Sequence, residues 1–168
     1  GGILFFSIKA TTTDSLFASR NFYGVLRVTA INADQPELRA YRLAHGAITH
    51  GYQYIASDRH DLPTAYFTEL SGIGLTMLNY PKRPGSMRVG VLGLGIGTLA
   101  SYAQPGDYFR LYEINPDVIR LAEGEGGYFS FLKDARGDVQ VVSGDARVSL
   151  EHELAIGQPQ HFDVLVLD

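Results

Sequence analysis

The feature that most constrains the fold is a regular alternation of apolar strands and short helices that begins at residue 87. The strand-like segments are MRVGVLGLG, YFRLYEIN, DVQVVSGD and FDVLVLD, and the helix-like segments between them are GTLASYAQ, PDVIRLAEG and ARVSLEHEL. Strands that alternate with helices form parallel sheets through right-handed crossovers, with helices on both faces. We therefore expect an α/β fold with a Rossmann-like parallel sheet.

The segment before this alternation has a different pattern. Stretches such as FYGVLRVTAI alternate apolar and polar residues, which predicts short antiparallel strands and hairpins. Helical spacing of apolar residues follows from Pro63, and the sequence PKRPGS then indicates a connector. We predict an N-terminal β domain over 1–62, a helix and connector over 63–86, and a Rossmann-like domain over 87–168. Because the last strand ends the chain, we expect a sheet truncated after its fourth strand, within a piece of a longer protein.

Composition excludes several classes of function. The chain has 14 basic and 18 acidic residues without a basic block, so we expect no nucleic-acid partner. It has no cysteine, which rules out disulfides and thiolate metal sites and fits a cytoplasmic location. No apolar run approaches the roughly 18 residues of a membrane span. His45 and His50 lack a metal-ligand spacing, so we expect strand histidines and no metal.

A glycine-rich turn follows the first strand of the alternating region. In VLGLGIGTLA, an apolar strand leads into Gly93, Gly95 and Gly97 before the expected helix. Glycine permits a sharp turn and a close approach of a ligand to the backbone. The same pattern also fits a plain turn between packed elements, so the glycines alone do not define a site.

Two acidic residues strengthen the case for a nucleotide site. Glu113 stands 20 residues after Gly93 at the end of the next strand, where a carboxylate can accept hydrogen bonds from both ribose hydroxyls. Asp145 follows the third strand, where it can accept from an adenine amino group or act as a helix N-cap. Ligands of open α/β sheets bind at the carboxyl edge, where these strand ends meet. We therefore predict a bound nucleotide.

The glycine spacing favours one class of nucleotide. A dinucleotide site has the pattern GxGxxG, whereas here Gly97 comes one residue early and Thr98 takes the next place. The pattern GxGxG with a strand-end acid and a later GDA resembles the fold of S-adenosylmethionine-dependent methyltransferases. Binding of NAD is the weaker alternative.

The chain also resembles the spermidine synthase family over nearly its whole length. The segments SRNFYGVLRV, LAHGAITHG, PTAYF, VLGLGIGT, LYEINPDVI, VVSGDAR and FDVLVLD occur in the same order as corresponding blocks of that family. The resemblance implies a small N-terminal β domain before a methyltransferase-like domain. It also implies polyamine biosynthesis, with transfer of an aminopropyl group from decarboxylated S-adenosylmethionine to an amine such as putrescine.

The resemblance implies roles for individual residues. Glu113 would hold the ribose, and Asp145 with Ala146 would hold the adenine. Asp168 would position or deprotonate the attacking amine, and Tyr66 would lie near the path of that amine. The remaining expectations are a small-molecule amine substrate, no metal and a homodimer.

Several positions depart from the family pattern. Ile96 stands where the family has an aspartate that binds the amine of the aminopropyl tail, and isoleucine cannot accept a hydrogen bond. His45 replaces the aspartate of an LDG block, Thr49 replaces a glutamine, and Phe67 and Thr68 replace the last two residues of a YHE triplet. Two alternatives therefore remain: a methyltransferase that uses intact S-adenosylmethionine, and a non-catalytic adenosyl-binding domain of a larger protein.

Overall fold

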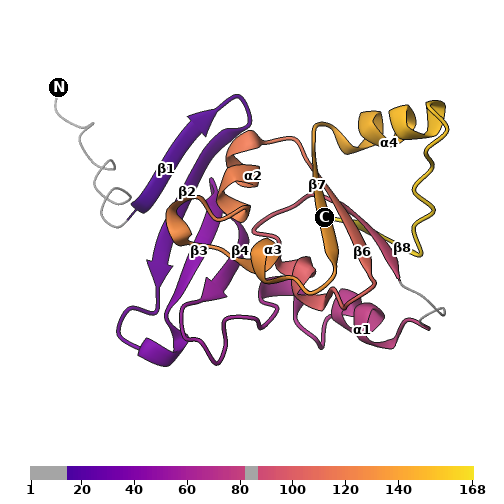
Figure 1. Cartoon of the computed structure of the whole chain (residues 1–168). Coiled ribbons are helices and arrows are strands. Elements are labelled where there is room, and N and C mark those ends of the chain that lie inside the picture. Colours follow the sequence, from indigo (N-terminus) through magenta and orange to yellow (C-terminus); the bar gives the residue numbers. More distant parts are fainter. Residues whose placement is uncertain (1–14, 82–86) are drawn as a thin grey trace, which may run out of the picture.

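The computed structural model describes residues 15–81 and 87–168, and the first part of the chain forms an antiparallel sheet (Figure 1). Its strands pair in chain order and are β1 (Ser15–Asn21), β2 (Gly24–Ile31), β3 (Ala40–His45) and β4 (Ile48–Tyr54), with the 3-10 helix η1 (Pro36–Leu38) before β3. Alternate side chains of β2 are buried, as the sequence pattern predicts. The expected N-terminal antiparallel sheet is confirmed, and residues 1–14 of the predicted β domain lie outside the described residues.

The second sheet is parallel and contains the four strands that the alternating region predicts. These strands are β5 (Arg88–Leu92), β6 (Tyr108–Glu113), β7 (Asp138–Ser143) and β8 (Val164–Leu167), and their order across the sheet is β7-β6-β5-β8. The chain runs outward from β5 to β7 and then returns to pair β8 with the other side of β5. The strand order therefore reverses between β5 and β8, and such a point is where open α/β sheets bind ligands.

Short helices connect the strands. They are η2 (Ala65–Phe67), α1 (Gly72–Asn79), η3 (Thr98–Tyr102), α2 (Pro116–Ala122), η4 (Glu125–Gly127), α3 (Phe131–Asp134) and α4 (Ala146–Ala155). The connections through η3 and α2 lead across the sheet from β5 towards β7, whereas the connection through α4 leads back from β7 to β8. Right-handed crossovers therefore place α4 on the other face of the sheet. Figure 1 shows α4 well apart from α2 and α3. None of the helices in the described ranges has the length and apolar character that crossing a membrane requires.

The helix expected over GTLASYAQ is shorter and tighter than the sequence suggests. The structure has the 3-10 helix η3 there, after Gly97 in a left-handed conformation with φ 81°. Only the residues from Thr98 to Gln104 separate this glycine from Pro105, which leaves room for about two turns of α-helix. The hydroxyl of Tyr102 donates to the backbone oxygen of Phe67 at 2.6 Å, which holds the end of the segment against η2.

Both sheets contribute to one hydrophobic core. Leu26 and Leu43 of the antiparallel sheet belong to the same buried cluster as Val91 and Leu111 of the parallel sheet. Gln53 at the end of β4 is buried and accepts a hydrogen bond from the backbone N–H of Ser130 at 2.8 Å. The division at 62 and 86 remains a prediction, since the packing is continuous across it.

A buried carboxylate links β1 to the start of α2. Asp117 accepts hydrogen bonds from the hydroxyl of Ser19 and from the amide of Asn21, the latter at 2.8 Å, and it also pairs with Arg120. Asn21 donates to Asn115 as well, at 2.7 Å, and Asn115 caps α2. The hydrogen bond from Ser19, followed by that from Arg120, lowers the pKa of Asp117 below its ordinary value of 3.8.

We expect Asp117→Asn to lower the free energy of unfolding at pH 7 by about 1–3 kcal/mol, because hydrogen bonds to a charged acceptor are lost. A lowered pKa in the folded state stabilises the protein above pH 3.8, and this contribution is lost as the pH falls through the folded-state pKa. The deficit of the variant should therefore shrink in acid. Urea unfolding at pH 7 and at a pH below 3.8 measures the loss of stability at each pH. Asp34→Asn, at an exposed position, is the control. A deficit that stays constant with pH would contradict the assignment.

Candidate functional site

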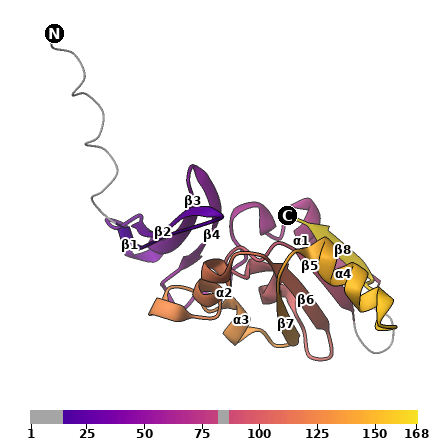
Figure 2. The ribbon, with the colours of Figure 1, turned by 90° about the horizontal axis from the view of Figure 1, so that it is seen from above.

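The predicted binding residues gather at the carboxyl edge of the parallel sheet. The glycine loop follows β5, Glu113 ends β6, Asp145 precedes α4 directly after β7, and Asp168 follows β8. Figure 2 shows this edge from above, with the end of the chain at the tip of β8. The fold thus brings the ends of all four parallel strands together, and the binding roles of these residues remain predictions.

Glu113 holds the glycine loop in place. Its Oε2 accepts from the backbone N–H of Leu94 at 3.2 Å, and its Oε1 accepts from the N–H of Asn115 at 2.8 Å. A carboxylate oxygen can accept more than one hydrogen bond, so each oxygen keeps capacity for a ribose hydroxyl. The same half-buried side chain can therefore shape the loop and contact a ligand.

The glycine loop is packed tightly against other backbone. A methyl group at Gly95 would lie 2.9 Å from the carbonyl oxygen of His50, and one at Gly93 would lie 3.3 Å from Cβ of Asp168. Gly93 has φ 107° and Gly95 has φ 55°, conformations that favour glycine. Neighbouring protein therefore accounts for glycine at both positions, as the plain-turn alternative expects, and β4 covers the loop.

Asp145 is the N-cap of α4. Its Oδ1 accepts from the backbone N–H of Val148 at 3.0 Å, and Ala146 is the first residue of the helix. The backbone N–H of Gly144 donates to the carbonyl oxygen of Glu113 at 2.8 Å, which joins the ends of β7 and β6. Since capping occupies one carboxylate oxygen, Oδ2 remains as the acceptor for an adenine amino group.

Ile96 does not line an open site. It is 1% exposed within the core, and a methyl group at Gly51 of β4 would lie 2.9 Å from its Cγ1. The expectation that this position faces the tail of the donor is therefore wrong for the structure described. The antiparallel sheet occupies the space, and the apolar side chain fits that packing.

Tyr66 and Asp168 meet although they are far apart in the sequence. Burial, and then the charge and hydrogen bonding of Asp168, raise the pKa of Tyr66 to about 12. Loss of hydration raises the pKa of the Asp168 side chain, while the hydrogen bond with Tyr66 and the charge of His50 oppose that rise. The two predicted acceptor-side residues thus form a pair, a protonated phenol beside a carboxylate.

His50 is a site residue that the sequence did not reveal. In the pairing of β3 with β4, Leu43 faces Gly51 and Ala44 faces Thr49, so His50 is the extra residue of a β-bulge. Its ring stacks on His45 with centroids 5.7 Å apart, and its Nε2 is buried without a hydrogen-bond partner in the described structure. The glycine that follows it was the available signal, because glycine within a strand often marks a bulge.

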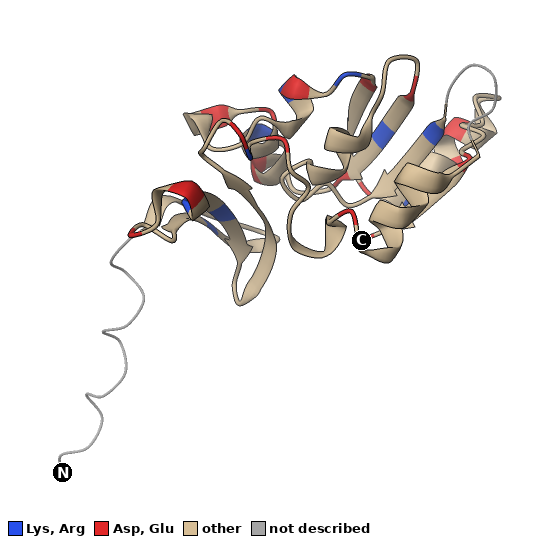
Figure 3. Cartoon of the chain, turned by 90° about the horizontal axis from the view of Figure 1, so that it is seen from below, with Lys and Arg blue, Asp and Glu red and all other residues tan. Residues whose placement is uncertain are grey.

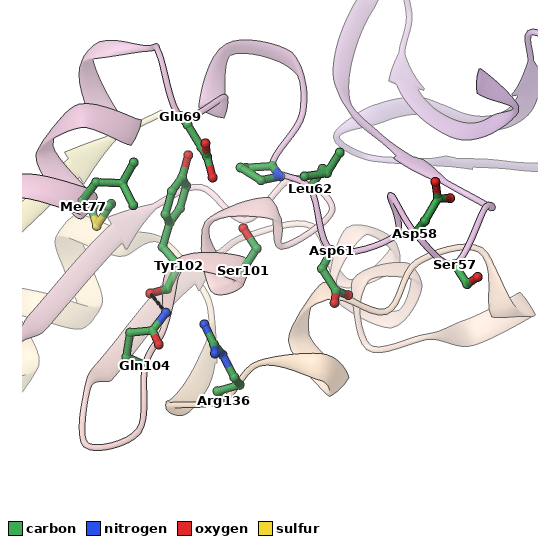
Figure 4. A pocket seen from close by; sticks show the side chains of 12 residues that line it. Ser57, Asp58, Asp61, Leu62, Glu69, Met77, Ser101, Tyr102, Gln104 and Arg136 are labelled. Carbon is green, nitrogen blue, oxygen red and sulfur yellow. Dashed lines mark hydrogen bonds between the residues drawn. The ribbon is translucent and has the colours of Figure 1, made fainter. Parts of the chain in front are cut away.

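One cavity lies away from this edge. It has a volume of about 370 Å³ and lies between the segment after β4, α1, η3 and Arg136 (Figure 4). Asp61, Glu69 and Ser101 are among its lining residues, and none of the predicted binding residues lines it. A nucleotide site at the carboxyl edge is therefore supported by strand topology and side-chain placement.

Charged residues of both signs are interspersed in the described structure. Figure 3 shows Lys and Arg residues scattered among Asp and Glu residues. Within residues 15–81 and 87–168, no group of three or more His, Asp or Glu side chains is placed to hold a metal ion. The rings of His45 and His50 stack on each other.

Comparison with known proteins identifies a structural neighbour. No protein-family model matches the chain, and no curated protein has a matching sequence. The crystal structure of a probable spermidine synthase from Corynebacterium glutamicum ATCC 13032 is similar, with a TM-score of 0.55 and 16% sequence identity. The match covers 80% of this chain and 46% of that chain, so this chain spans about half the length of its neighbour. At this identity the likeness shows a shared mixed α/β fold, with a four-stranded parallel sheet and a separate four-stranded antiparallel sheet, consistent with a methyltransferase-like fold.

Proposed function

We propose that this chain belongs to a transferase of the spermidine synthase type, which moves an aminopropyl group from decarboxylated S-adenosylmethionine to a polyamine acceptor such as putrescine. The observation that carries the proposal is the placement of Glu113 and Asp168 on the two strands that flank β5, around the point where the strand order reverses. One carboxylate is available to a ribose and the other to an amine. The structural neighbour, a probable spermidine synthase, supports the same class of enzyme.

The residues around the glycine loop suit an adenosyl group. Glu113 accepts at Oε2 from Leu94 of the glycine loop and at Oε1 from Asn115, and each oxygen keeps capacity to accept a hydroxyl proton. Asp145 retains one carboxylate oxygen, at the end of the strand next to β6. A ligand that offers two ribose hydroxyls and an amino group would match these acceptors, and its sulfonium would supply an activated carbon.

Asp168 and Tyr66 suit an acceptor that must lose a proton. An alkyl ammonium has a pKa of about 10.4, like lysine, so it has to be desolvated and deprotonated before it can attack. A carboxylate beside the amine stabilises the positive charge on its nitrogen, and Tyr66 beside Asp168 can hold the orientation of that carboxylate. Asp168 would then orient the amine for attack.

Methyl transfer from intact S-adenosylmethionine is the second candidate, because Glu113 and Asp145 would suit the adenosyl group of either donor. Ile96 is buried in the core and does not discriminate between the two donor tails. Calorimetric titration of the whole protein with both donors separates the candidates. Tighter binding of the decarboxylated donor, with product formed from putrescine, supports aminopropyl transfer. Tighter binding of intact S-adenosylmethionine supports methyl transfer, and binding without turnover supports a non-catalytic domain.

We expect Glu113→Ala to weaken binding of 5′-methylthioadenosine, which carries the adenosyl part of either donor, by roughly 1.5–3 kcal/mol, because a charged acceptor is lost. Isothermal calorimetry measures the change. Glu37→Ala, at an exposed glutamate on η1, is the matched control and should bind like the wild type. Unchanged affinity in a folded Glu113→Ala variant would remove the nucleotide site from this edge.

We expect Ile96→Asp to lower the free energy of unfolding by at least about 3 kcal/mol, because an unpaired carboxylate would be buried against Gly51. Ile96→Val should cost only about 0.5–1.5 kcal/mol. Urea unfolding compares the two variants. An aspartate variant that is as stable as the wild type and prefers the decarboxylated donor would show that this position faces the tail after all.

A further inference from the structure

The bulge in β4 gives His50 a position that regular strand pairing would not. A β-bulge leaves its extra residue outside the ladder and redirects that residue, and bulges are frequent next to active sites. Here the carbonyl oxygen of His50 lies against Gly95, and the ring stacks on His45 of β3. The bulge thus fixes the backbone of His50 on the glycine loop.

The surroundings of the His50 ring are those of a proton acceptor. Its Nε2 is buried without a hydrogen-bond partner among the described residues. Burial, and then His45, lower the pKa of the ring, which favours the neutral form, while Glu113 and Asp168 act in the opposite direction. If the ring takes up a proton, these two carboxylates stabilise the imidazolium. Tyr66 is a further titratable group of this site, and it interacts with Asp168.

We propose that His50 is a further catalytic residue of the acceptor side, which accepts the proton of an ammonium substrate at Nε2 while Asp168 orients that substrate. The inference rests on the proposed function, because the reaction needs a sulfonium donor at the glycine loop. It assigns to the antiparallel sheet a direct part in the chemistry.

Proton transfer to His50 and formation of the C–N bond together conserve atoms and charge. The acceptor ammonium gives one proton to Nε2 of His50 and becomes a neutral amine. The amine lone pair then forms a C–N bond to the carbon attached to the sulfonium, the C–S bond breaks, and its electron pair makes the sulfur a neutral thioether. The product is a secondary ammonium, and the imidazolium returns its proton to water after the product leaves.

The test measures turnover of decarboxylated S-adenosylmethionine and putrescine by the whole protein as a function of pH. We expect His50→Gln to lower kcat by about 10²–10⁴-fold. Affinity for 5′-methylthioadenosine should be retained, because Gln keeps a polar side chain and the adenosyl contacts are elsewhere.

The wild-type rate should fall in acid as the ring becomes protonated. His45→Gln should move that fall to higher pH, because one cause of the low His50 pKa is removed. His152→Gln, at an exposed position of α4, should change nothing.

An independent readout covers the case in which His50→Gln does not fold. NMR titration of the His50 ring should give a pKa below 6.5 in the wild type and a still lower pKa in Asp168→Asn, because that carboxylate raises it. An unchanged kcat and pH profile in folded His50→Gln, or a ring pKa insensitive to Asp168→Asn, would overturn the role of His50 alone. A wild type that binds no 5′-methylthioadenosine, or that binds it and turns over neither donor, would overturn the proposed transferase, and the role of His50 with it.

Discussion

The contact between β4 and the glycine loop is the constraint on which the rest of the site depends. The carbonyl oxygen of His50 lies where a side chain at Gly95 would be, and Gly51 leaves room for Ile96. This packing fixes the loop from one side while Glu113 fixes it from the other. The antiparallel sheet is thus part of the wall of the site, and the shape of the loop depends on both sheets.

Two polar links between the antiparallel sheet and the rest of the chain also restrict how the two parts pack. Asp117 accepts from Asn21 of β1, and Gln53 of β4 accepts from Ser130, so the links involve the two edge strands of that sheet. Buried polar groups must find partners, so such links accept only a narrow range of relative positions. Hydrophobic packing between the sheets supplies attraction, whereas these hydrogen bonds define one arrangement.

The sequence predicted the parts of the fold that follow from local pattern. Alternation of strands and helices predicted the four parallel strands, and the helix-like segment PDVIRLAEG coincides with α2 at its start. The helix expected after Gly97 is present but is a short 3-10 helix, because the conformation there depends on a short span and on a contact with Phe67. At the site, strand-end acids could be placed from their spacing alone. The burial of Ile96 and the importance of His50 could not, because both depend on a sheet from the other half of the chain.

The bulge at His50 adds a residue that the pairing of β3 with β4 does not need but that the candidate site uses. Residues on either side of it pair in two registers that differ by one residue. A chain lacking that one residue could close the ladder without a break and keep both sets of pairs. The sheet would survive such a deletion, while the imidazole and the carbonyl oxygen against Gly95 would be lost together. Within this architecture, one inserted residue is therefore enough to turn a structural hairpin into a contributor of chemistry.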